Sequence, residues 1–405
     1  MMPDPDVLTR RELNRALLAR QLLLEPDTER DAVAAVEHLI GMQAQAPFPP
    51  YYGLWSRLGG FRPDDLATLI STRNVVRVAL MRGTIHLVSA RDCLPLRAIM
   101  QPVLDRAFRT NHYKRLTGVD LVELAVRGRE LVDAEPMTFS ELGKALAARW
   151  PGNPPADLAQ GVRALVPLVQ VPPRAVWGQA GVARHTSAEA WLSGGAVGAG
   201  SAAGAGGAAV LGGAAGAGGA AVLGGAVVLG GAGAAVLDHA ALVRRYLAAF
   251  GPATVRDIQA WSGLTGLRAV VEELRPALVT FRDEAGAELF DLPDAPRPPG
   301  DTPVPVRLVA EFDNLVLSHA DRTRIFAGVD MARMYSINGI VPGSVLVDGF
   351  VAGLWRLATI RKTATLALEL WDGVPDRRAV TSEAERLLAF AAPGATHDIR
   401  FEPSS

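Results

Sequence analysis

One local pattern recurs three times before residue 296: short helices followed by two paired strands. In the first copy the expected elements are helices over Asn14–Leu24, Ala32–Ile40 and Leu66–Ser71, and strands over Asn74–Leu80 and Thr84–Val88. Apolar residues follow a helical period in the helices, whereas Val76, Val78 and Leu80 alternate with the period of a strand. Helices followed by a hairpin are typical of a winged helix.

The second and third copies repeat this order. The second has expected helices over Val119–Asp133, Glu141–Trp150 and Ala156–Val166, then a small wing of Leu168–Val171 and Ala175–Trp177. The third has expected helices over Ala240–Phe250, Val255–Ser262 and Gly266–Pro276, then strands over Leu278–Arg282 and Glu288–Leu292. Thr254 and Thr265 stand where helix N-caps are expected. Three such units in tandem are much stronger evidence than one.

The pattern becomes all-β after a proline-rich linker, 293–305. Candidate strands are Arg307–Ala310, Val316–Leu317, Ile325–Phe326, Ser344–Val347, Phe350–Arg356 and Thr363–Leu370, and a helix over Val380–Ala391 ends the fold. The predicted fold class is mainly α with β (α+β), with three tandem winged-helix units and a C-terminal β-barrel-like subdomain. The expected units are 1–115, 116–192, 237–295 and 296–405, with 193–236 as an insertion.

The segment Ser193–Val236 has no charged residue and is almost entirely glycine, alanine, valine and leucine. An uncharged apolar stretch of this length is a candidate membrane span. Its glycine density argues against a helix, because glycine in place of alanine costs about 1 kcal/mol per helical position. A flexible insertion in a loop is the interpretation that the composition favours, and no membrane partner is expected.

A net charge of -1 does not by itself indicate a nucleic-acid partner, but basic residues cluster locally. Nine of them lie from residue 73 to residue 115 against two acids: Arg73, Arg77, Arg82, Arg91, Arg97, Arg106, Arg109, Lys114 and Arg115. A solvated helix face is the alternative, but Arg82 would lie at a wing tip, where such folds contact DNA. The residues expected to contact DNA are Arg77, Arg82, His86, Arg109, Arg322, Arg324 and Arg356. His86 is equally well explained as a satisfied core histidine.

Motifs of the common hydrolases are missing from the sequence. There is no HExxH run, phosphate-binding loop or nucleophile elbow, and the single cysteine, Cys93, excludes a paired-cysteine metal site. No metal and no cofactor are expected. The N-terminus has no secretory signal pattern, so a cytoplasmic protein is expected. Gln43 and Gln45, after an expected helix end at Gly41, have a structural explanation as caps of helix carbonyls.

Several runs resemble one family of DNA repair enzymes. They are Leu13–Leu24, Gly41-Met-Gln-Ala-Gln-Ala-Pro47, Leu80–Val88, Leu247–Thr254, Phe312–Arg322 and Leu346–Arg356. Together they resemble the AlkZ-like winged-helix DNA glycosylases of actinobacteria, over nearly the whole chain except Ser193–Val236. The resemblance implies three winged helices in a C shape with a β subdomain. It also implies a catalytic Gln-apolar-Gln signature, matched here by Gln43-Ala44-Gln45, where a sister branch has aspartate at the second position.

The same resemblance implies excision of N7-alkylated purines from damaged double-stranded DNA by a monomer. Some members of the family unhook interstrand crosslinks, as self-resistance in producers of alkylating antibiotics. The chemistry is compatible with glutamines, because an N7-alkylated guanine is cationic and leaves readily. What remains is to hold a water beneath C1′, and amide oxygens can accept from that water without a titrating base. No carboxylate pair is then needed, and Glu37 is expected at the surface.

Two alternatives remain. With no lysine before Lys114, a lyase step through a Schiff base is less expected than simple hydrolysis, although Lys114 itself is not excluded. Winged helices are also common in transcription regulators, and a fold does not establish catalysis. A regulator needs base-reading side chains along a recognition helix, and Gly266–Pro276 offers only Arg268, Glu272, Glu273 and Arg275. An inactive paralogue that shelters lesions is the other possibility.

Overall fold

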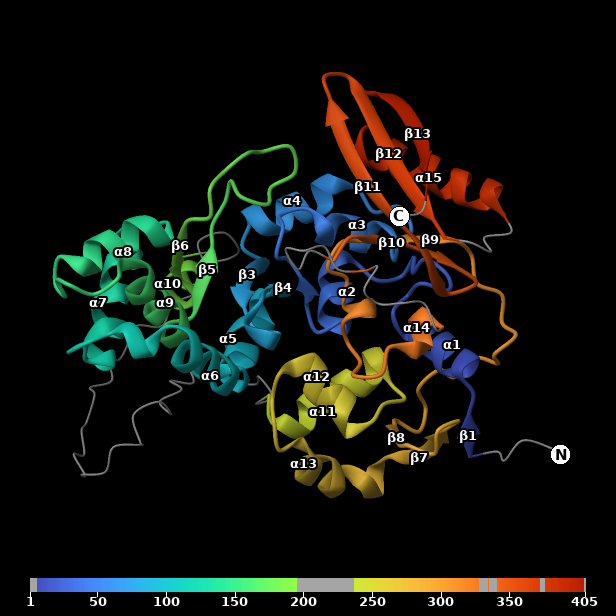
Figure 1. Cartoon of the computed structure of the whole chain (residues 1–405), viewed down its shortest axis with the longest axis horizontal. Coiled ribbons are helices and arrows are strands. Elements are labelled where there is room, and N and C mark those ends of the chain that lie inside the picture. The colour runs from blue at the N-terminus through green and yellow to red at the C-terminus, as the bar shows by residue number, and fades with distance from the viewer. Residues whose placement is uncertain (1–5, 195–236, 328–333, 335–340, 372–375, 404–405) are drawn as a thin grey trace, which may run out of the picture.

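Three groups of helices with short strands, and one larger sheet, make up the computed structural model of the chain (Figure 1). It describes residues 6–194, 237–327, 334, 341–371 and 376–403. The predicted insertion therefore lies outside the described residues, apart from Ser193 and Gly194. The class is mixed α and β, as the sequence predicts. Of the helices in the described part of the chain, none has both the length and the hydropathy to cross a bilayer.

The first group lies at the centre of the molecule, with the other three parts around it (Figure 1). Its elements are α1 (Arg10–Arg20), α2 (Ala32–His38), β2 (Met42–Gln43), α3 (Pro49–Trp55), α4 (Pro63–Ser71), β3 (Val75–Ala79), β4 (Ile85–Ser89), α5 (Ala90–Ile99) and α6 (Gln101–Asn111). A 3-10 turn, η1 (Met81–Gly83), joins β3 to β4. The predicted hairpin is confirmed to within one residue at each end.

The second group shares a sheet with the first. Its elements are α7 (Leu121–Ala134), α8 (Phe139–Ala147), α9 (Pro155–Leu165), β5 (Leu168–Gln170), β6 (His185–Ser187) and α10 (Ala188–Ser193). The strand order β2-β4-β3-β5-β6 places Arg77 opposite Gln170. The predicted strand Ala175–Trp177 is wrong: Ala175 has φ 67°, and the Val176 amide donates to the Pro173 carbonyl, so the chain turns there.

The third group contains α11 (His239–Phe250), α12 (Val255–Ser262), α13 (Leu267–Leu274), β7 (Val279–Asp283) and β8 (Glu288–Asp291), close to the predicted ranges. An N-terminal strand that the sequence pattern did not indicate, β1 (Val7–Leu8), pairs in parallel with β7. Helix α1 connects this group to the rest of the molecule through buried polar contacts. Arg20 and Asp291 form an ion pair of 2.6 Å with both side chains fully buried.

The C-terminal sheet is open, with strand order β13-β12-β11-β10-β9. Its elements are β9 (Arg307–Val309), α14 (Thr323–Phe326), β10 (Gly343–Val347), β11 (Phe350–Ile360), β12 (Thr363–Leu370), α15 (Arg377–Ala391) and β13 (Thr396–Glu402). Strands β13 and β9 are its two edges, so the described residues do not close into the expected barrel. The two predicted strands Val316–Leu317 and Ile325–Phe326 are wrong. A 3-10 turn, η4 (Asn314–Val316), covers Val316, and Leu317 lies outside any strand. Helix α14 includes Ile325 and Phe326. Short apolar runs do not distinguish strand from buried helix.

Strand β13 also corrects the prediction that a helix ends the fold. It pairs in parallel with β12 after the chain has crossed the sheet through α15. Helix α15 buries Val380, Ala384, Leu387 and Leu388 against that sheet, together with the side chain of Trp355. The sheet is thus held on one side by α15, and its β9 end leads directly into the loop that meets the first group.

Candidate active site

A sharp turn after α2 brings the two glutamines into position. Ile40 and Gly41 both have positive φ, 56° and 87°, which reverses the chain between α2 and β2. A Cβ on residue 41 would lie 2.7 Å from Cγ1 of Val88 and 3.0 Å from the Leu87 carbonyl oxygen. Only glycine therefore fits between α2 and β4 in this backbone conformation. The turn seats Gln43 opposite His86 in the antiparallel pair β2–β4.

The amide of Gln43 is held by an arginine. Its side chain is 7% exposed, and Oε1 accepts a hydrogen bond of 2.6 Å from Nη2 of Arg82. A guanidinium only donates, so the Gln43 carbonyl must face Arg82 and the Nε2 amide group must face away from it. Nη1 of Arg82 donates in turn to the Trp261 carbonyl of α12, at 2.5 Å. Burial, followed by the nearby charge of Arg322, lowers the pKa of Arg82 to about 10.

Gln45 is exposed, and its amide is also tied to the hairpin. Its Oε1 accepts a hydrogen bond of 3.2 Å from the backbone amide of Ile85, at the start of β4. Each glutamine carbonyl thus has one fixed donor, which leaves one lone pair for a further donor such as water. The two amides are preorganised by β4 and its turn, rather than capping the carbonyls of α2 as the structural explanation proposed.

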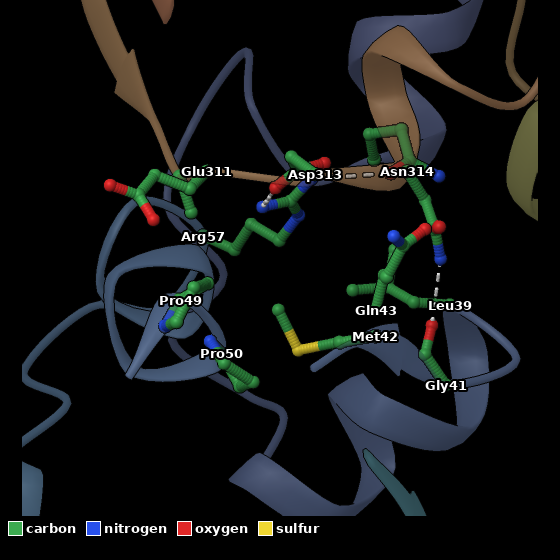
Figure 2. Close-up of a pocket in the computed structure, with 12 residues that line it drawn as sticks. Leu39, Gly41, Met42, Gln43, Pro49, Pro50, Arg57, Glu311, Asp313 and Asn314 are labelled. Carbon is green, nitrogen blue, oxygen red and sulfur yellow. Dashed lines mark hydrogen bonds and ion pairs between the residues drawn. The ribbon is translucent and has the colours of Figure 1, made fainter. Parts of the chain in front are cut away.

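A small hollow of about 10 Å³, with room for about one water molecule and open to solvent, lies beside Gln43. Gln43 and Met42 line one side, and Pro49 and Pro50 line another (Figure 2). The loop after β9 contributes Glu311, Asp313 and Asn314. Asn314 Nδ2 donates to the Gly41 carbonyl at 3.1 Å, so this loop also supports the turn that carries Gln43.

Two charged groups of the hollow neutralise each other. Asp313 accepts two hydrogen bonds of 2.8 Å from the guanidinium of Arg57, and both side chains are buried. This bidentate pair joins the helix α3 region to the loop after β9 (Figure 2). Glu311, the remaining carboxylate there, has no such partner among the described residues. Glu37, expected at the surface, is bonded to Arg91 at 2.6 Å.

Arg77, His86 and Arg324 lie inside the protein, which differs from their expected contact with DNA. Arg77 is 2% exposed and donates to the Ala44 carbonyl at 2.6 Å, so it supports the glutamine segment from below. Arg324 is 5% exposed and donates to the Pro252 carbonyl at 2.7 Å. In this placement they offer almost no surface to a phosphate, and their visible contacts are structural.

His86 is fully buried beside Arg82 and Gln43. Its Nδ1 lies 3.1 Å from the Thr84 carbonyl, an acceptor, so Nδ1 carries the hydrogen and Nε2 is left as an acceptor. No described residue bonds to that Nε2. Burial, and then the charge of Arg82, lower the pKa of His86 to about 3, so its ring is neutral at physiological pH. Its burial places His86 in the core and away from a DNA-facing surface, but with Nε2 unpaired in the described part of the chain it is not the satisfied core histidine of the alternative.

The other expected DNA contacts differ in accessibility. Arg109, on α6, is exposed and makes no ion pair with another described residue. Arg356, on β11, has a side chain that is 59% exposed, and it lies 3.8 Å from Glu369 and 3.6 Å from Glu402. Arg322 is half-buried near Arg82, and its Nε donates to the His319 carbonyl at 3.3 Å. Within the described ranges, no three metal-binding side chains come close enough to hold an ion.

Sequence reasoning missed the partners that surround Gln43. The sequence predicts a DNA contact for Arg82 and gives no role to Asn314 or Glu311, although the run that contains Asn314 contributes to the family resemblance. Their sequence separation from Gln43 is the reason, since 39 residues separate Arg82 and 271 separate Asn314 (82 − 43 and 314 − 43). The signal that the sequence offers for Arg82 and Asn314 is that each is a polar residue inside an otherwise apolar run.

Comparisons with known proteins agree with this architecture. The family model described as DNA glycosylase AlkZ-like matches residues 36–390. Among solved structures, Streptomyces sahachiroi DNA glycosylase AlkZ is similar, with a TM-score of 0.69 and 18% sequence identity, over 98% of this chain and 100% of that chain. At this identity the likeness shows a shared fold. No curated protein matches the chain. Because the family model covers most of its length, the chain belongs to the AlkZ-like DNA glycosylase family.

Proposed function

We propose that this protein is a monofunctional DNA glycosylase that hydrolyses the N-glycosidic bond of N7-alkylated purines in damaged double-stranded DNA. The observation that carries the proposal is the pair of anchored amides. Gln43 and Gln45 each have a carbonyl oxygen tied to a donor on the β3–β4 hairpin, at 2.6 Å and 3.2 Å. Both oxygens retain a lone pair for a water molecule.

The reaction asks for positioning more than for acid–base catalysis. Alkylation at N7 places a positive charge on the purine, so the base leaves as a neutral molecule and the sugar becomes oxocarbenium-like. Two fixed amide oxygens can hold the attacking water below C1′ and stabilise the developing positive charge of the sugar. Since the amides do not reorganise during the step, their contribution does not depend on a titrating base.

The rest of the chain serves to hold DNA. We propose that the three helix-plus-hairpin groups are winged-helix units, 1–115, 116–192 and 237–295, arranged as a C with the subdomain 296–405, and that the chain acts as a monomer. Arg109, Arg322 and Arg356 are the proposed phosphate contacts that have accessible surface. The proposed site of action is the nucleoid, in the cytoplasm.

Crosslinked duplexes are a second proposed substrate. Gln45 is exposed, and the hollow beside Gln43 is open to solvent, so an adduct that joins the strands does not have to enter an enclosed cavity. A role in self-resistance to alkylating antibiotics would follow from that activity.

Incubation of the purified protein with an N7-methylguanine duplex tests the proposal. We expect release of free N7-methylguanine, measured by mass spectrometry, with an intact abasic strand that breaks only after alkali. Strand cleavage without alkali would contradict monofunctional hydrolysis, and no released base would contradict the substrate assignment. A nitrogen-mustard crosslinked duplex, resolved on a denaturing gel, tests unhooking separately.

A further inference from the structure

Glu311 is a half-buried carboxylate at the rim of the hollow that Gln43 lines. Figure 2 places it across the hollow from Gln43, and no drawn interaction links it to the other labelled residues. Within the described part of the chain it accepts no hydrogen bond and forms no ion pair. The carboxylate oxygens of Glu311 are not among the fully buried polar atoms that lack a hydrogen-bond partner, so they are accessible to a ligand.

This lack of a partner is unusual in this protein. Its well-buried acids are matched with arginines: Asp313 with Arg57, Asp291 with Arg20, Asp92 with Arg245 and Asp157 with Arg115. A carboxylate withdrawn from water without a cation is costly, because burial disfavours its charged form. Burial alone accordingly raises the pKa of Glu311, with no arginine lowering it.

We propose that Glu311 is a specificity-determining residue that recognises the positive charge of the N7-alkylated base. The inference rests on the proposed function and names how the same site selects its substrate. Glu311 does not act on the water held by the glutamines. It provides the unmatched negative charge that a cationic purine neutralises on binding, whereas an unmodified or neutral purine leaves that charge unpaired.

The charge of the base also predicts which kinetic constant depends on Glu311. The positive charge is on the base in the ground state and moves to the sugar as the bond breaks. A group that binds the cationic base therefore lowers KM without raising kcat. We expect Glu311→Gln to raise KM for N7-methylguanine DNA without lowering kcat, because the interaction that is lost weakens as the bond breaks. A residue that only supports the fold would not produce this separation.

Two duplex probes of equal shape isolate the effect of charge. Both carry a 2′-fluoro-2′-deoxyribose, which resists cleavage; one has the cationic base N7-methylguanine and the other the neutral base 7-methyl-7-deazaguanine. We expect the wild-type protein to bind the cationic probe about tenfold more tightly, equivalent to about 1.4 kcal/mol. In Glu311→Gln the ratio of the affinity for the cationic probe to that for the neutral probe should fall close to one. Glu135→Gln, the same change at a side chain that is 78% exposed, should keep the wild-type ratio.

The outcomes separate this inference from the proposed function. If the wild-type protein releases N7-methylguanine but binds both probes equally, the charge recognition is overturned and the glycosylase proposal stands. If folded Glu311→Gln keeps the wild-type ratio of affinities for the two probes, charge recognition by Glu311 is overturned as well. The wild-type comparison needs no variant, so it remains decisive if Glu311→Gln does not fold. If no N7-methylguanine is released at all, the proposed function itself fails.

Discussion

Arg82 donates a hydrogen bond of 2.6 Å to the side-chain carbonyl of Gln43, and so connects that amide to a distant part of the chain. Its other terminal nitrogen reaches the Trp261 carbonyl in the third helical group. Arg82 has φ 56°, so the turn between β3 and β4 folds the side chain back toward β2 instead of outward. A residue expected at the tip of a wing thus serves to orient Gln43.

Substitution of Arg82 should reduce the chemical step. In Arg82→Gln the Gln43 amide loses its fixed donor, and misplacement of a positioning group costs about 10²-fold in rate. We expect a single-turnover rate lower by about this factor at saturating protein, with a smaller change in DNA affinity. Arg106→Gln is the matched control, because Arg106 also donates to a carbonyl, that of Gly263, but does not reach Gln43. Equal loss in both variants would contradict the assignment.

Removal of either glutamine side chain should block excision. Gln43→Ala and Gln45→Ala should each reduce the release of N7-methylguanine by at least about 10²-fold, the cost of removing one preorganised polar group. DNA affinity should be nearly unchanged, as measured by fluorescence anisotropy. Gln179→Ala, at an exposed position outside the site, is the control. Full activity of the double variant Gln43→Ala/Gln45→Ala would remove the glutamines from the mechanism.

The hairpin of β3 and β4 is predictable because its apolar residues alternate with a strand period and Gly83 lies at the turn. The site around Gln43 is not, because its arrangement depends on contacts between distant segments. Positive φ at Ile40 and Arg82, and the approach of Asn314 to the Gly41 carbonyl, leave no periodic signal in the sequence. The burial of Arg77 is equally hidden: a basic residue on an alternating strand indicates a surface, whereas β3 is buried on both faces.

The pair of Arg57 and Asp313 should be important for stability. Both side chains are almost fully buried, at 1% and 4% exposure, and the contact is bidentate. Asp313→Asn leaves the Arg57 charge unmatched, and breaking a buried pair in this way costs about 3–5 kcal/mol. Urea unfolding measures the loss. Glu130→Gln breaks the exposed pair with Arg127 and should cost no more than about 1 kcal/mol. Similar small losses in both variants would contradict the prediction.

Stability should decrease below neutral pH because buried histidines, among them His86 and His185, are held in the neutral form. Burial is the main cause that lowers the pKa of His86 to about 3 and of His185 to about 4, from 6.5 in the unfolded chain. Between these values the unfolded chain binds more protons than the folded one, so the free energy of unfolding falls as the pH falls below 6.5. Each histidine changes the free energy of unfolding by up to about 1.4 kcal/mol per pH unit in this range. Its stabilising contribution is fully present above pH 6.5, the pKa in the unfolded chain. Urea unfolding at about pH 7.5 and about pH 5 checks this. Equal stability at the two pH values would show that these rings are not buried neutral.

Arg109 is the exposed arginine best placed to test the electrostatic part of DNA binding. It lies on α6 without an ion-pair partner among the described residues, so a phosphate contact would release one counterion. Arg109→Ala should weaken binding to damaged and undamaged duplexes equally, and should lower the slope of log affinity against log salt by about 1. The single-turnover excision rate at saturating protein should not change, since Arg109 does not reach the glutamines. Arg244→Ala, at an exposed position on α11, is the control. A loss of affinity for damaged DNA alone would instead make Arg109 part of lesion recognition.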